Sequence, residues 1–227
     1  MNHRTSSTHQ QSRSGTIRGK KGFTIVELLI VVVVIAVLAA IAISAYRGIQ
    51  ERAYASKANS TAMAYDKAIR LYYLQNQTLP GGGFDTNGFS GGCLGTASEY
   101  PASADFPAGA CFKSVLASGG TPFYYSHNSQ LNTDLQSVIK TPPSGGLPIV
   151  SGKSGSGAYT YDMSYRGVFY YFWNEAPGSQ YNDSFQLIYH IKGDMPCAAD
   201  LWSRSVESDK SSTECNMLVN LGSTGIN

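Results

Sequence analysis

One unbroken apolar run near the N-terminus limits what this chain can fold into. From Leu28 to Ile43 every side chain is apolar, and the longer stretch from Phe23 to Ala45 holds a single charge, Glu27. At about 1.5 Å per residue this stretch forms a helix of roughly 35 Å, enough to cross a hydrocarbon layer of about 30 Å. Because lipid offers no partners to backbone N–H and C=O groups, a single spanning segment has to be helical. We therefore expect this segment to enter a membrane.

The residues before the run predict its orientation. The leader from Met1 to Lys21 is basic and contains no acidic residue; its charges are Arg4, Arg13, Arg18, Lys20 and Lys21. Positive charge just ahead of an apolar segment keeps that end in the cytoplasm. The rest of the chain is then expected on the other side of the membrane.

Glu27 is a candidate functional residue because of where it lies. A carboxylate inside a membrane segment costs about 2.5–3.5 kcal/mol at the centre and less near the end, so it needs a partner. If the chain is cut between Gly22 and Phe23, the new α-ammonium lies about one helical turn from Glu27. It could then neutralise Glu27 of the same copy or of a neighbouring copy.

The segment KKGFTIVEL at residues 20–28 resembles the class III signal of type IV prepilins and related pseudopilins. The resemblance covers roughly residues 20–47 and implies that a membrane prepilin peptidase cuts after Gly22. It further implies that Phe23 is then N-methylated, and that Glu27 helps to dock each subunit into a helical filament. Beyond this window the chain shares only the general plan of that family, a long helix followed by a Gly- and Tyr-rich head.

Two other interpretations of the apolar run stay open at this point. A conventional signal peptide has a small-residue cleavage site after its apolar core, and Ala40-Ile41-Ala42 would serve as one. A plain signal anchor would keep the run uncleaved. A signal peptide does not need the carboxylate of Glu27. The N-terminal residue of the mature protein discriminates between the three.

The prediction is therefore a structural subunit of a type IV pilus-like filament. Its expected partners are the prepilin peptidase, the membrane before assembly, the pilus assembly machinery and copies of itself. We expect a single-pass membrane protein with a cytoplasmic N-terminus that becomes part of an extracellular filament. One alternative is a pseudopilin or minor pilin of a type II secretion or DNA-uptake system. Another is a membrane-anchored surface domain that never polymerises and contacts carbohydrate through Tyr124, Tyr125 and Trp202.

The charge balance argues against a nucleic-acid partner. The formal net charge of the whole chain is +2, but the leader supplies five of its positive charges. From Phe23 onward 12 basic residues stand against 15 acidic residues, a formal net charge of −3. The mature body has no overall basic excess for phosphate backbones, so no specific nucleic acid is predicted.

The four cysteines, Cys93, Cys111, Cys197 and Cys215, all follow the membrane segment. With the leader held inside, they lie in an oxidising compartment where disulfides are the default. Three pairings are possible for four cysteines. We favour Cys93–Cys111 and Cys197–Cys215, because each closes a loop of modest length that contributes around 3 kcal/mol. A zinc site is the rival, but the chain has no C-x-x-C pair.

The expected fold class is α+β, with a long N-terminal helix packed on a small antiparallel sheet. We divide the chain into a leader at 1–22, a helix at 23–78 with a transmembrane half at 23–46, and a head at 79–227. The absence of proline from Ser44 to Gln77 predicts that the helix continues through this stretch. Pro80 and the glycines that follow it are expected to end the helix. Gly48 is the expected point of bending. An apolar stripe should face the sheet: Ala62, Tyr65, Ile69, Tyr72 and Tyr73.

Within the head, residues 81–121 are rich in Gly and Pro and are expected to be irregular, with a short helix possible from Cys111 to Leu116. The spacing of Leu and Ile predicts a short amphipathic helix at 131–140, capped by Asn132 or Thr133. Three or four antiparallel strands should then cover the helix stripe. The strands expected from β-branched and aromatic residues are 158–165, 168–173 and 184–192, with 147–150 as an edge strand and 151–157 as its turn.

No set of residues with the pattern of an active site stands out, so we predict no catalytic residue, no cofactor, no metal and no enzymatic activity. His127 and His190 are expected in a loop or on a strand face. The triplet Gly152-Lys153-Ser154 lacks the first glycine of a phosphate-binding loop and is interpreted as part of a turn. Calcium is a weaker possibility, because acidic residues gather around the last cysteine loop: Asp194, Asp200, Glu207, Asp209 and Glu214.

Overall fold

The computed structural model describes residues 22–82, 88–154, 157–174, 183–198, 203–207 and 211–221. The chain divides into two compact units, Met1–Ala45 and Tyr46–Asn227. Helix α1 (Ile25–Asn76) contributes residues to both units. The leader at 1–21, on which the orientation prediction rests, lies outside the described residues.

In the first unit, α1 carries apolar side chains on all sides. Its large side chains from Phe23 to Ile43 are between 50% and 85% exposed. In the described part of the chain α1 is the one helix that is long and apolar enough to cross a membrane. A helix that is apolar all round is stable only when lipid or other protein covers it.

The second unit contains two antiparallel sheets. The helix-facing sheet has the order β1-β6-β7-β9-β8, with bounds β1 (Phe89–Cys93), β6 (Phe169–Trp173), β7 (Ser184–Lys192), β9 (Ser212–Asn220) and β8 (Ser203–Val206). The outer sheet has the order β3-β2-β5-β4, with bounds β3 (Phe123–Ser126), β2 (Ala110–Leu116), β5 (Tyr161–Gly167) and β4 (Gly146–Ser154). Helix α2 (Ser129–Gln136) and two 3₁₀ turns at Ala97–Glu99 and Gly157–Tyr159 complete the unit.

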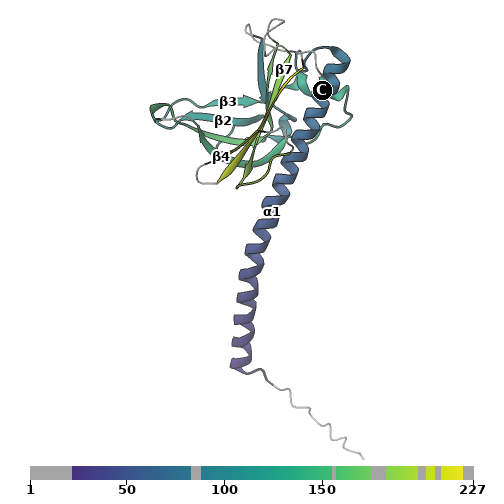
Figure 1. The fold of residues 1–227 in the computed structure, drawn as a ribbon. Coiled ribbons are helices and arrows are strands. Elements are labelled where there is room, and N and C mark those ends of the chain that lie inside the picture. Colours follow the sequence, from purple (N-terminus) through teal and green to yellow (C-terminus); the bar gives the residue numbers. More distant parts are fainter. Residues whose placement is uncertain are drawn as a thin grey trace, which may run out of the picture. The chain divides into compact units, whose positions relative to one another are not determined.

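The part of α1 in the second unit lies along the helix-facing sheet, and the strands β2 and β3 lie on the other side of that sheet (Figure 1), whereas Leu147 of β4 reaches the core around α1. The apolar stripe of α1 is confirmed: Ala62, Tyr65 and Ile69 are fully buried, while Tyr72 and Tyr73 pack partly buried at its end. The sheet side of this core comes from alternate positions of three strands: Tyr170, Phe172, Phe185, Leu187, Tyr189, Ile191, Cys215 and Met217. The predicted α+β architecture is therefore correct.

Side-chain hydrogen bonds also fix α1 to the chain that crosses over it. The Tyr65 hydroxyl donates to the carbonyl oxygen of Pro143 at 2.8 Å, and Lys57 Nζ donates to that of Gly146 at 3.0 Å. The segment between these carbonyls lies so close to its neighbours that only glycine fits at position 145. A Cβ built on Gly145 would lie 1.9 Å from the carbonyl oxygen of Leu94.

The α1 helix ends earlier than the proline and glycine run suggests. Gln77 adopts a left-handed conformation with φ of 55°, and its N–H donates to the carbonyl oxygen of Tyr73 at 2.7 Å. This closes the last turn as a C-terminal cap does. The helix is continuous through Gly48, the expected bending point.

The outer sheet covers the second face of the helix-facing sheet with aromatic rings. Phe112 of β2 and Tyr165 of β5 stack on Phe169 of β6, with ring centroids 5.3 and 5.8 Å apart. Ile188 of β7 joins the same cluster. Because both of its faces are covered, the helix-facing sheet is a middle layer rather than a surface layer.

The prediction of a single sheet with three or four strands is wrong. The structure has nine strands in the described residues, and the segments predicted at 158–165 and 147–150 belong to the outer sheet, although Leu147 of β4 still packs in the core around α1. Strand β4 also extends through 151–154, which the sequence assigned to a turn. The C-terminal strands β8 and β9 were not predicted, because their polar residues suggested a solvated loop.

The prediction that residues 81–121 are irregular is also wrong. This region contains β1 and β2, and the segment proposed as a short helix from Cys111 to Leu116 is strand β2. Its neighbours β3 and β5 bind it on both edges, so pairing outweighs the weak local helix preference. The amphipathic helix expected at 131–140 is present as α2, which begins two residues earlier and ends four residues earlier, so Asn132 and Thr133, expected as caps, lie inside it. Its cap is Asn128, whose Oδ1 accepts from the N–H groups of Gln130 and Leu131.

A buried arginine holds the loop between Tyr100 and Ala110 in place. Arg166 of β5 is 7% exposed and donates to three backbone carbonyls: Ala110 at 2.6 Å, Pro101 at 2.6 Å and Pro107 at 3.1 Å. Its guanidinium lies 4.5 Å from the centroid of the Phe106 ring. The irregular loop thus has its carbonyl groups satisfied by one side chain.

We predict that Arg166→Leu destabilises the fold by about 3–5 kcal/mol, because it removes a charged donor from three backbone carbonyls, of which that of Pro107 also accepts from the N–H of Ala110. The matched control is Arg70→Leu, since Arg70 bonds the partly exposed Asp66 one turn away on α1 and should cost less than about 1 kcal/mol. Urea unfolding of the detergent-solubilised chain measures both. Equal losses would show that Arg166 is no more important than a surface arginine.

Candidate functional site

The junction between leader and helix is open to solvent in the described residues. Phe23 is 80% exposed, and a Cβ placed on Gly22 would meet no atom within 4 Å. Helix α1 starts two residues after Phe23. Within the described residues the Gly22–Phe23 bond is therefore exposed and lies before the start of the helix.

Glu27 closes the first turn of α1 together with Thr24. The Thr24 N–H and hydroxyl both donate to Glu27 Oε2 at 3.0 Å, and the Glu27 N–H donates to Thr24 Oγ1 at 3.2 Å. This reciprocal arrangement is a capping box, in which a threonine before the helix and a glutamate three residues later satisfy each other's backbone donors. It stabilises the start of the helix just where the apolar run begins.

The sequence pattern led us to expect only an ionic partner for Glu27, the α-ammonium of a cut Phe23. In the uncut chain the carboxylate is bound by Thr24 instead. The signal was present in the sequence as Thr-Ile-Val-Glu before an apolar run, the pattern of a capping box. Phe23 directly precedes this turn in the chain, and the role of Gly22, Phe23 and Glu27 in processing and assembly stays a prediction.

The two disulfides join the cysteines in the order favoured from loop length. Cys93 is bonded to Cys111 and Cys197 to Cys215, each pair separated by 18 residues. The first bond links β1 of the helix-facing sheet to β2 of the outer sheet, and the second ties the loop after β7 to β9. Both therefore connect segments of the head and leave α1 free of covalent links.

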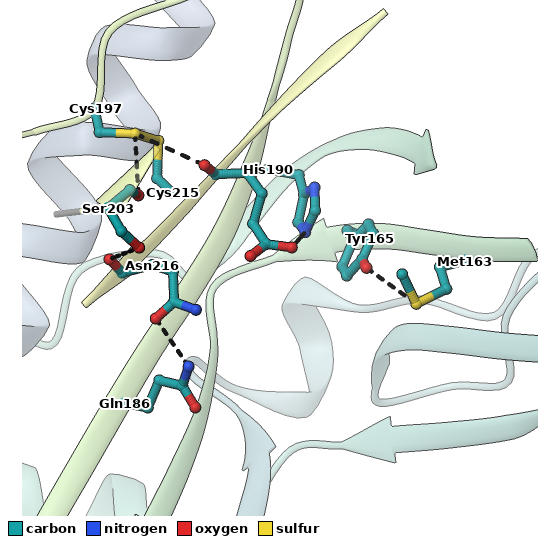
Figure 2. Close-up of polar contacts among 9 residues, drawn as sticks. Met163, Tyr165, Gln186, His190, Cys197, Ser203, Cys215 and Asn216 are labelled. Carbon is teal, nitrogen blue, oxygen red and sulfur yellow. Dashed lines mark hydrogen bonds and ion pairs between the residues drawn. A yellow bond between two sulfur atoms is a disulfide. The ribbon is translucent and has the colours of Figure 1, made fainter. Parts of the chain in front are cut away.

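His190 is a buried strand residue with an unusual environment (Figure 2). Its side chain is 2% exposed, and its ring stacks on that of Tyr165 with centroids 3.4 Å apart. Nε2 lies 3.5 Å from Oε2 of Glu214, directly across from it on β9. Burial lowers the pKa of His190 to about 3, and burial also raises the pKa of Glu214. The histidine is therefore neutral at physiological pH and has a structural place between the sheets.

The other residues singled out from the sequence have separate places in the described part of the chain, or lie outside it. Tyr125 packs edge-on against Tyr171 in the aromatic cluster between the sheets, and Trp202 lies outside the described residues. Of the acidic residues considered for calcium, Asp194 pairs with Arg204. Asp200 and Asp209 lie outside the described residues. Within that part of the chain, no three His, Cys, Asp or Glu side chains are grouped to hold a metal.

Comparison with known proteins agrees with the N-terminal geometry. Residues 17–43 match the family model of the prokaryotic N-terminal methylation motif. A fimbrial protein of Neisseria meningitidis serogroup B (strain ATCC BAA-335 / MC58) is 32% identical over 117 residues, which is 52% of this chain and 61% of that protein. No solved structure gives a significant match.

Two further relatives are matched over shorter stretches. The type IV major pilin protein PilE of Neisseria gonorrhoeae is 39% identical over 61 residues, 27% of this chain and 36% of that protein. The type II secretion system core protein G of Escherichia coli strain K12 is 36% identical over 61 residues, 27% of this chain and 42% of that protein. The chain thus covers less than two thirds of each of these relatives. It carries the methylation motif and is similar to type IV pilins and to a secretion-system core protein, none of them named as an enzyme.

We predict that acid destabilises the head through His190. Its pKa in the folded chain lies below the ordinary 6.5, so the unfolded chain binds a proton first as the pH falls. Stability is therefore lost from about pH 6.5 downward, at up to about 1.4 kcal/mol per pH unit. The raised pKa of Glu214 acts in the opposite sense, because the folded chain takes up that proton first.

Urea unfolding at pH 7 and pH 5 of the wild type and of His190→Phe measures this effect. Phenylalanine can keep the stack on Tyr165 but cannot bind a proton, so the variant should lose less stability between the two pH values. Glu214→Gln separates the contribution of the carboxylate. The same loss in wild type and His190→Phe would contradict the prediction.

Proposed function

We propose that this chain is a structural subunit of a type IV pilus-like filament. In this proposal the prepilin peptidase cuts after Gly22, Phe23 is N-methylated, and the subunit assembles through the apolar part of α1. The observation that carries the proposal is the combination of the methylation motif at 17–43 with a capped helix whose apolar side chains are exposed on all sides. A plain signal anchor would also have an exposed apolar helix, but it needs no carboxylate at Glu27.

The mechanism is an exchange of one apolar environment for another. Fully burying a Val, Leu, Ile or Phe side chain is worth about 1.5–3 kcal/mol relative to leaving it in water. The run from Leu28 to Ile43 therefore has to stay covered at every stage. The bilayer covers it before assembly, and the same segments of neighbouring copies cover it in the filament.

Glu27 gives the assembly its axial register. Cleavage creates an α-ammonium on Phe23, and this cation is a suitable partner for a carboxylate in a medium of low dielectric constant. Thr24 satisfies one oxygen of Glu27 within its own chain, so the other oxygen is available to an ammonium. A neighbouring subunit that is shifted along the axis would leave both charges unpaired.

The disulfide-bonded head supports export across the membrane. Disulfides persist in oxidising compartments, and both bonds lie C-terminal to the apolar run. This agrees with a basic leader that stays in the cytoplasm. Two bonds within the head also allow it to remain folded after it leaves the cell.

The alternative is a pseudopilin or minor pilin, and the similarity to a type II secretion core protein favours it. Both functions use the same motif and helix. Abundance separates them, because a major pilin forms the bulk of isolated filaments whereas a minor subunit is present in few copies.

We predict that the mature chain starts at an N-methylated Phe23, and that Gly22→Leu abolishes this processing. Gly22 has free space around it, so the substitution should leave the fold of this chain intact and act on recognition by the peptidase. Mass spectrometry of the N-terminal peptide from surface fibres gives the result. A mature chain that begins near Ile43 would instead indicate a conventional signal peptide.

We further predict that the charge of Glu27, rather than its role in capping, controls assembly. Glu27→Gln keeps a side chain that can close the capping box but removes the charge. Thr24→Ala weakens the cap by about 1 kcal/mol and keeps the charge. Filament yield, measured by electron microscopy and by the fraction of sheared protein, should fall strongly in Glu27→Gln and only slightly in Thr24→Ala. Membrane insertion should be unchanged in both, and the opposite order of yields would assign Glu27 to helix capping alone.

A further inference from the structure

A pocket of about 520 Å³ opens in the second unit between α1, β4 and β7. One wall is formed by α1 residues at helical spacing, namely Arg47, Gln50, Glu51 and Tyr54. Because these positions are three and four residues apart, they continue the stripe of α1 that is buried farther along on the sheet. The pocket is therefore the open end of the groove that α1 otherwise fills.

The opposite wall is apolar, and part of it comes from a strand segment that has no partner residues on β5. It is formed by 147–150 of β4, the edge strand of the outer sheet, and by Ile191 of β7. The register of β4 shifts between Gly146 and Val150, so the residues between them bulge away from β5. Ile149 within this bulge is 52% exposed, and Tyr54 across the pocket is 45% exposed.

The pocket carries a net positive charge. Lys192 pairs with Glu51 at 3.4 Å, whereas Arg47 has no carboxylate within ion-pair distance in the part of the chain that the structure describes. Burial keeps His190, which also lines the pocket, neutral at physiological pH. Two cations, one carboxylate and an apolar wall make a site for an amphiphilic anion.

The α1 wall of the pocket starts close in the chain to the end of the apolar stretch. Arg47 follows Ala45, the last residue of the apolar stretch, by two positions, and a fully extended chain spans at most about 3.6 Å per residue. Arg47 is therefore within roughly 7 Å of the point where the chain leaves the hydrocarbon layer. This is the depth at which phosphate headgroups lie and at which Arg and Tyr side chains are favoured.

We propose that the pocket binds the headgroup of an anionic phospholipid while the subunit is stored in the bilayer. The inference rests on the proposed membrane-stored subunit and adds its ligand. The Arg47 guanidinium would bind the phosphodiester with two parallel hydrogen bonds, and Lys192 would add a second positive charge. The apolar wall around Ile149 would receive the glycerol and the first methylene groups of the acyl chains. The body of the protein has a formal net charge of −3, so this local cation is what attracts it to an anionic surface.

The test uses the purified full chain in a neutral detergent, titrated with phosphatidylglycerol or with phosphatidylcholine. Native mass spectrometry counts the lipids bound to each chain. We expect one phosphatidylglycerol to be retained in preference to phosphatidylcholine. Arg47→Ala and Lys192→Ala should each weaken its binding about fivefold, the factor for one cation near a charged surface.

Arg52→Ala is the matched control, because it removes the same charge from the same exposed region of α1. Arg52 is five positions after Arg47, about 140° around the helix axis, and does not line the pocket. It should leave the preference for phosphatidylglycerol unchanged. Equal weakening by Arg47→Ala and Arg52→Ala would reduce the effect to general charge attraction and overturn the proposal.

Three further outcomes separate this inference from the proposed function. If the chain inserts into vesicles of phosphatidylcholine but shows no preference for phosphatidylglycerol, the headgroup site is wrong and the membrane-stored subunit stands. If the chain does not insert into either kind of vesicle, the proposed function itself fails. If Arg47→Ala leaves lipid binding intact but prevents filament formation, the pocket belongs to a contact with a neighbouring copy, which also overturns the proposal.

Discussion

The second unit depends on the contact between one stripe of α1 and the helix-facing sheet. The stripe begins with small residues, Ala55, Ala58 and Ala62, which let the helix backbone approach the sheet closely. It then widens into Tyr65 and Ile69, which fill the core. The Tyr65 hydroxyl donates a hydrogen bond to the carbonyl oxygen of Pro143, so the polar end of this buried side chain has a partner. Without this contact the apolar face of the sheet would be open to water.

The outer sheet explains why β6 of the helix-facing sheet is apolar or aromatic at every position. Strand β6 places Tyr170 and Phe172 against α1 and Phe169 against the outer sheet. An antiparallel strand with one solvated face would alternate apolar and polar residues. Here each face has its own core, and one disulfide, Cys93–Cys111, joins the two sheets.

The sequence predicted the features that depend on local pattern. The long helix, its buried stripe and the strand 184–192 follow from the 3.6- and 2-residue periods of the apolar side chains. The sequence pattern did not predict the strands that form only because residues far away in the sequence pair with them. Strand β2 has a weak pattern of its own and forms because β3 and β5 bind both its edges. The second sheet was missed for the same reason, since the aromatic run of β6 does not say whether one or two layers cover it. At the N-terminus the motif identified Glu27, and the Thr24 cap was readable but was not considered.

If the chain forms the filament proposed above, the closure of the first helical turn by Thr24 and Glu27 has a consequence for the entropy of polymerisation. Fixing the backbone of one residue costs about 1–2 kcal/mol of conformational entropy. Both members of the pair lie on the C-terminal side of the Gly22–Phe23 bond, so removal of the leader does not break it. In the proposed filament, the end that docks into neighbouring copies would then be ordered before it arrives. Ordering this end would then cost little of the association free energy. A larger share of that free energy would distinguish a correctly positioned subunit from a displaced one.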